Sequence, residues 1–88
     1  MATEKEILKS LQVLPGVGSS IAQDLYDIGL RSPDELAGRD AGELYDRLCI
    51  LRNQRIDRCV LYVFRCAIYF ASNESHEPDK LKWWKWKD

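Results

Sequence analysis

The residues best suited to chemistry in this sequence lie at positions 14–18, which read LPGVG, and in the two serines that follow. Glycine leaves no side chain in the way of an approaching ligand. Gly18, Ser19 and Ser20 are predicted to begin a helix, where the first N–H groups have no partner within the helix and the helix dipole favours an anion. Such a helix start is suited to binding a phosphate. Leu14 and Val17 are expected to lock the two flanking helices together.

A second candidate for phosphate contact is the arginine-rich second half of the chain. The net charge is −1, yet the charges are unevenly placed. Residues 16–46 carry seven acids and residues 47–65 carry five arginines, Arg47, Arg52, Arg55, Arg58 and Arg65. We expect Arg52, Arg55 and Arg58 to contact one strand of a duplex while the glycine turn contacts the other. The alternative is that these arginines pair with the acids of the middle segment.

Neither catalysis nor metal binding is predicted, because no nucleophile has a base beside it in any recognisable pattern. Cys49, Cys59 and Cys66 are odd in number and lie among apolar residues, as buried cysteines do. A zinc site with His76 would need spacings of 10, 7 and 10 residues, without the close cysteine pair that zinc sites favour. His76 is therefore expected to be solvated, and the chain is expected to be no enzyme and to need no cofactor.

Five helices are predicted from helix-start signals and from apolar residues spaced three and four apart. Capping boxes are expected at Thr3 with Glu6 and at Ser20 with Gln23, and Gly29 is expected to end a helix. The expected units are a first hairpin of two helices (3–29), a connector helix (32–38), a second hairpin (40–72), and a loop with a Trp-rich tail (73–88). In the second hairpin, Asp40 and Asn53 are the expected caps. No run alternates with a period of two, so no sheet is expected.

An internal repeat would relate the two hairpins. A shift of 34 residues places five apolar residues of the first hairpin on five of the second: Leu11, Leu14, Val17, Ala22 and Leu25 on Tyr45, Leu48, Leu51, Ile56 and Cys59. The second hairpin would then be a degenerate copy of the first. The alternative is a plain five-helix bundle.

The glycine segment also carries a family resemblance. Residues 14–22, followed by Leu25 and Gly29, resemble the helix-hairpin-helix motif of DNA repair and recombination proteins. The resemblance implies that a DNA phosphate, bound without reading of bases, would be held by Gly16, Gly18 and the residue at position 20. It also implies a monovalent cation on the carbonyls of Gln12, Leu14 and Val17. The family has a basic residue at position 20 and this chain has Ser20, so the arginines must supply the charge.

A closer resemblance covers nearly the whole chain. Residues 14–18 (LPGVG), 56–67 (IDRCVLYVFRCA) and 81–88 (LKWWKWKD) together resemble the small bacterial pathogenicity-locus family, some members of which carry a mitomycin-resistance label. The first two thirds are also similar to the C-terminal domain of the competence regulator TfoX. The expected fold is all-α, a tandem helix-hairpin-helix (SAM-like) domain at 1–72 with the tail of residues 73–88 packed on it.

Two functions are expected from different classes. The first is a cytoplasmic module, without enzymatic activity, that contacts the DNA backbone. The second is a protein-interaction or homodimer module, joined through the fifth helix or the Trp tail, in which the hairpin is purely architectural. Association with a membrane is not expected, because no apolar run approaches the roughly 20 residues that cross a bilayer.

Overall fold

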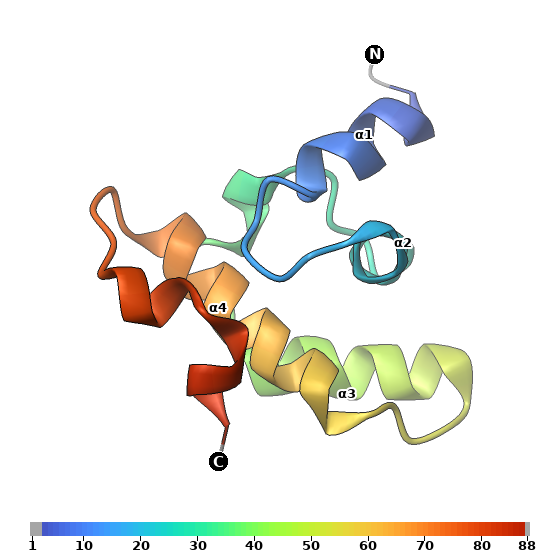
Figure 1. Cartoon of the computed structure of the whole chain (residues 1–88). Coiled ribbons are helices and arrows are strands. Elements are labelled where there is room, and N and C mark those ends of the chain that lie inside the picture. Colours follow the sequence, from blue (N-terminus) through green and yellow to red (C-terminus); the bar gives the residue numbers. More distant parts are fainter. Residues whose placement is uncertain (1–2, 88) are drawn as a thin grey trace.

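The computed structural model describes residues 3–87, and every regular element in that range is helical. Residues 3–87 form four α-helices and three short 3₁₀-helices: α1 (Glu4–Leu11), α2 (Ser19–Asp27), η1 (Pro33–Leu36), α3 (Ala41–Arg52), α4 (Arg58–Ser72), η2 (Pro78–Leu81) and η3 (Trp83–Trp86). In Figure 1 the hairpin of α1 and α2 lies above α3 and α4, and the tail folds back along α4. The all-α class is confirmed. In the described part of the chain, no helix is long and apolar enough to cross a membrane.

Local capping fixes several helix ends where the sequence predicts them. The Glu6 N–H donates to Thr3 Oγ1 at 3.2 Å and so caps α1. In the same way the Glu43 N–H donates to Asp40 Oδ1 at 3.2 Å at the start of α3. Gly29 adopts a φ of +102°, which lets the Leu30 N–H reach back to the Leu25 carbonyl at 2.9 Å and close α2.

The prediction of five helices is wrong, because the connector at 32–38 is a single 3₁₀ turn. Its backbone leaves the helical region at Ala37, where ψ is 126°, and Leu36 is already fully buried.

The expected N-cap at Asn53 is also wrong. Asn53 has a φ of 54° and closes α3, whereas Asp57 caps α4 by accepting the Cys59 N–H at 2.8 Å. Asparagine suits both ends of a helix, so its type alone does not decide between them.

The predicted register of the internal repeat is wrong as well. The shift of 34 residues would start the second helix of the second hairpin near residue 53, but α4 begins at Arg58. Burial disagrees in the same way: Val17 is 6% exposed and its supposed counterpart Leu51 is 51% exposed. Residues 41–72 still form two helices joined by a turn, but the shift of 34 does not align them with the first hairpin.

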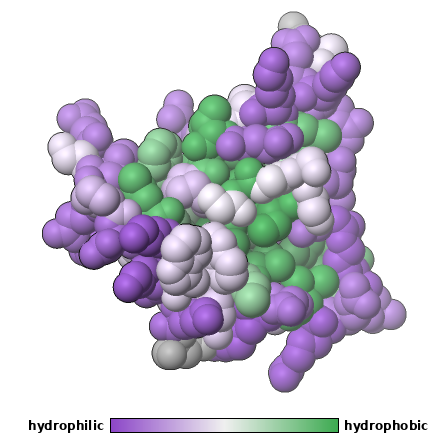
Figure 2. Space-filling model, in the orientation of Figure 1, coloured by the Kyte–Doolittle hydropathy of each residue, from purple (hydrophilic) through white to green (hydrophobic). Residues whose placement is uncertain are grey.

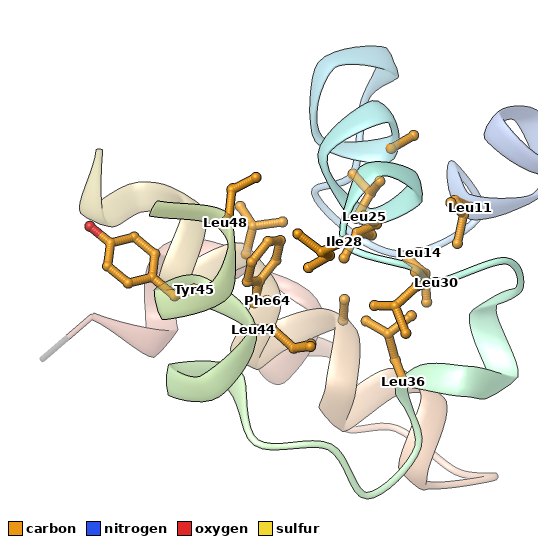
Figure 3. Packing of buried hydrophobic residues seen from close by; sticks show 14 of the residues in the cluster. Leu11, Leu14, Leu25, Ile28, Leu30, Leu36, Leu44, Tyr45, Leu48 and Phe64 are labelled. Carbon is orange, nitrogen blue, oxygen red and sulfur yellow. The ribbon is translucent and has the colours of Figure 1, made fainter. Parts of the chain in front are cut away.

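One apolar core is shared by both hairpins. Leu14 and Leu25 come from the first hairpin, Leu36 from η1, Leu48 from α3 and Phe64 from α4, and all of them are buried in one cluster (Figure 3). Burial of this apolar area is the main force that holds the elements together. Neither hairpin therefore encloses a separate core of its own.

The described part of the tail is tied to α4 and to itself by hydrogen bonds. Arg65 Nη1 donates to the Trp86 carbonyl at 2.7 Å, and Trp86 Nε1 donates to the Lys80 carbonyl at 2.8 Å. Cys66 Sγ contacts the same Lys80 carbonyl at 3.3 Å. Residues 1, 2 and 88 of the expected ranges 1–72 and 73–88 lie outside the described residues.

Candidate functional site

The turn between α1 and α2 is fixed on its inner side by the core. Leu14 is 2% exposed and Val17 is 6% exposed, as expected for the residues that lock the two helices together. The Val17 N–H donates to the Leu14 carbonyl at 3.2 Å. That carbonyl is one of the three that the family resemblance assigns to a monovalent cation, together with those of Gln12 and Val17.

On its outer side the turn is approached at Gly16 by Trp83 of the tail, although Gly16 itself stays exposed. Gly16 has a φ of +80°, in the region that favours glycine. A Cβ atom built there would lie 3.0 Å from Trp83 Cδ1 and 3.2 Å from Trp83 Cβ. Gly16 is therefore required by the fold, both for its conformation and for the close approach of Trp83.

The start of α2 is open, in contrast to Gly16. Gly18 is the N-cap in place of the expected Ser20–Gln23 capping box, and no side chain caps the helix. A Cβ at Gly18 would meet no atom within 4 Å, and Gly18, Ser19 and Ser20 are exposed. No group among residues 3–87 accepts a hydrogen bond from the N–H of these three residues, and the first turn of α2 holds no acid. The helix start thus has the donors that an anion needs.

Arg52 forms ion pairs with two acids of α2, so its guanidinium group is already engaged within the protein. Its Nη2 atom lies 2.8 Å from Asp24 Oδ1 and 2.7 Å from Asp27 Oδ2, and its side chain is 31% exposed. Hydrogen bonds from Arg52 and from Gln23 lower the pKa of Asp27, and the bonds to Asp24 and Asp27 raise the pKa of Arg52. For Arg52 the structure follows the alternative that arginines pair with the acids of the middle segment.

Arg55 and Arg58 lie together in a groove beside the start of α4. The groove has a volume of about 700 Å³, and Arg65, about two helical turns beyond Arg58, also lines it. Asp46 and Asp57 line it too, and the Asp57 carboxylate accepts the Cys59 N–H, which lowers the pKa of Asp57 and so favours its charged form. The exposed guanidinium group of Arg55 is the part of this groove best suited to an oxygen anion such as phosphate.

The groove is built by the turn at residues 53–57. The Tyr45 hydroxyl donates to the Ile56 carbonyl and so ties this turn to α3. The structure therefore divides the predicted site residues into two sets. Gly18, Ser19 and Ser20 share the start of α2, Arg55 and Arg58 share the groove, and Arg52 belongs to neither. The sequence did not reveal that Trp83 covers Gly16, because residue spacing carries no sign of so distant a contact.

Figure 2 shows the face of the molecule that carries the α1–α2 turn. Apolar side chains gather across its middle, and hydrophilic residues surround them. Val13, in the turn, is 64% exposed. The middle of this face is therefore more apolar than its margins.

The cysteines and the histidine are separate from these surfaces. Cys66 is buried, which raises the pKa of its thiol to about 11, while Cys59 is exposed and Cys49 is half-buried. The expectation that His76 is solvated is wrong: its ring stacks on Phe70 at 4.5 Å, and Nε2 lies 2.8 Å from the Phe70 carbonyl. No group of three or more metal-binding side chains occurs within residues 3–87.

Comparison with known proteins assigns the chain to a family. Residues 4–88 match the family described as "Pathogenicity locus". The chain belongs to the pathogenicity locus family. It is also 34% identical over 74 residues to a Streptomyces lavendulae protein named "Mitomycin resistance protein McrB", a match that covers 84% of this chain and 67% of that protein. No solved structure matches. The similarity to the TfoX C-terminal domain stays a prediction.

The two glycines of this member of the pathogenicity locus family are expected to respond differently to substitution. Gly16→Ala places a Cβ at positive φ against Trp83, so we expect the free energy of unfolding to fall by about 1–2 kcal/mol. Gly18→Ser is expected to cause no loss, because its backbone is extended and serine is a good N-cap. Urea denaturation of both variants is the measurement. Equal losses would contradict the assigned role of Trp83, and Gly16→Ala in a Trp83→Ala background should cost less.

The ion pair at Asp27 predicts a pH dependence of stability. Because the folded state holds the pKa of Asp27 below its usual value of 3.8, the charged carboxylate stabilises the fold above that pH. This contribution is lost as the pH falls through the folded-state pKa. We therefore expect wild type to exceed Asp27→Asn in stability at pH 7 and the difference to shrink below about pH 4. Urea denaturation across this range measures it. Asp34→Asn removes an exposed carboxylate as a control, and an equal difference at pH 7 and pH 3 would contradict the account.

Proposed function

We propose that this protein is a helix-hairpin-helix module, without enzymatic activity, that binds the phosphate backbone of DNA without reading bases. The observation that carries the proposal is the open start of α2. Gly18, Ser19 and Ser20 there are exposed, and their N–H groups have no acceptor among residues 3–87. Backbone N–H groups at a helix start recognise a phosphate oxygen and carry no information about base identity.

The arginine groove supports the proposal by supplying the charge that Ser20 lacks. Arg55 is exposed and makes no ion pair with any residue from 3 to 87. Arg58 shares the groove with it. Release of counterions by such cations provides most of the affinity in binding that is independent of sequence. With a net charge of −1, the protein is expected to bind weakly and only at low salt.

Arg52 contributes to this function indirectly. Asp24 and Asp27 lie on the helix whose start is to receive the phosphate, and their charges would repel it. Arg52 pairs with both of them and so offsets that repulsion. We therefore take Arg52 out of the contacting set and assign direct contact to Gly18, Ser19, Ser20, Arg55 and Arg58.

A second function is favoured by one specific observation at the end of α3. Ile50 is 80% exposed and Leu51 is 51% exposed, and they line a shallow groove with Ile28 and Gly29. Exposed apolar residues that adjoin one another are common in protein contacts. A protein-interaction module would use this end of α3. The expected dimer surface on the longest helix, α4, is largely covered by the chain's own η1, η2 and η3.

The proposed function predicts a salt-dependent DNA affinity with a defined dependence on arginine. In a fluorescence-anisotropy titration with duplex DNA, affinity should fall steeply with salt. Arg55→Ala and Arg58→Ala should each weaken binding and lower the salt slope by about 0.9. Arg31→Ala is the matched control, because Arg31 lies against Tyr26 at the other end of α2. Absence of binding at low salt, or an equal loss in the control, would overturn the proposal.

A further inference from the structure

The three tryptophans of the tail differ in what they contact. Trp83 packs against the core and against Gly16. Trp86 donates its Nε1–H to the Lys80 carbonyl at 2.8 Å, and its ring lies 5.6 Å from that of Tyr69. Trp84 stands apart from both, because 48% of its surface remains exposed. Docking of the tail explains Trp83 and Trp86 and leaves Trp84 without a structural role.

Trp84 is held in a defined position although it is exposed. Its ring lies 5.8 Å from that of Trp83 at an angle of 88°, an edge-to-face contact. The two rings therefore do not stack face on face, and at least one face of Trp84 is clear of Trp83. Trp83 is itself anchored, so the indole of Trp84 is presented on a firm support.

Cationic side chains flank this indole. Lys82 and Lys85 precede and follow the tryptophan pair, and both are exposed. Lys85 makes no ion pair with any residue from 3 to 87, and the partner of Lys82 is Asp79 at 3.5 Å, whose side chain is 81% exposed. So exposed a pair contributes little and opens readily. The surface around Trp84 thus combines an aromatic face with positive charge.

The fold places Trp83, the neighbour of Trp84, against the glycine turn. Trp83 contacts Gly16, Trp84 is the next residue along the tail, and Gly18 is two residues along the turn from Gly16. Trp83 therefore links the part of the tail that carries Trp84 to the turn that leads into α2.

We propose that Trp84 is a stacking platform for an unpaired nucleobase, with Lys82 and Lys85 on the phosphates of the same strand. Aromatic rings interleaved with cations are the means by which proteins hold single strands. Bases inside a duplex are stacked on both faces and are not available to an indole. The protein should therefore prefer single-stranded or frayed DNA to a fully paired duplex. This inference rests on the proposed function.

The test compares one sequence in two forms, a short single-stranded oligonucleotide and the corresponding blunt duplex, by fluorescence anisotropy at low salt. Wild type should bind the single strand more tightly. Trp84→Ala should weaken single-strand binding about tenfold, as expected for loss of one base–aromatic stack, and should change duplex binding less than about twofold. Trp84→Phe keeps an aromatic face and should retain most of the affinity. Ile50→Ala is the matched control, since Ile50 is an exposed apolar residue on α3.

The other outcomes separate failure of the stacking platform from failure of the proposed function. If wild type binds the duplex but Trp84→Ala does not alter single-strand binding, the stacking platform is overturned while the proposed function stands. If wild type binds neither form, the proposed function fails, and the inference fails with it. Equal losses for both forms would also overturn the platform. Sedimentation velocity separates the remaining case: a dimer that Trp84→Ala converts to a monomer would assign Trp84 to a second copy of this chain.

Discussion

The two-sided packing of the turn between α1 and α2 is the constraint on which the other features of this molecule depend. From the inner side, Leu14 and Val17 are buried in the core. From the outer side, Trp83 presses against the backbone at Gly16, where a side chain would collide with it. A turn held in this way cannot rearrange without disturbing both the core and the tail. It therefore fixes the direction of α2 and the place of the tail together.

Some of the charged side chains that could bind a ligand form ion pairs within the fold instead. The strongest ion-pair cluster among the described residues joins Arg52 to Asp24 and Asp27, and it links the end of α3 to α2. Arg52, which the sequence predicts as a phosphate contact, thus joins the two hairpins instead. The same pairing offsets part of the negative charge on the helix proposed to meet the phosphate. Binding then falls to groups that the fold leaves exposed, the N–H groups at the start of α2 and the guanidinium of Arg55.

Features set by neighbouring residues could be predicted from the sequence. The caps at Thr3 and Asp40 and the end of α2 at Gly29 depend on contacts within a few residues, and they occur as predicted. The prediction of an N-cap at Asn53 failed because asparagine can begin or end a helix. The register of 34 residues failed because 45% of the chain is hydrophobic, so apolar matches arise by coincidence.

Contacts between distant segments could not be predicted in the same way. The burial of Leu14 and Val17 follows from their position between two amphipathic helices. By contrast, the contact of Trp83 with Gly16 and the pairing of Arg52 with Asp24 join residues far apart in the chain. Their partners are decided by how the helices pack, and a single sequence holds no direct sign of that packing. For this reason the candidate site was predicted as a set of residue types, and its division into an open helix start and a separate groove was not.

Phosphate binding at the start of α2 is tested by titrating the ¹⁵N-labelled protein with a short DNA and following the amide chemical shifts. We expect the amides of Gly18, Ser19 and Ser20 to shift first and furthest, because their N–H groups are the proposed donors to phosphate. Shifts centred on Ile50 and Leu51, or no shifts at low salt, would contradict it. The first of those results would instead favour the exposed end of α3 as the functional surface.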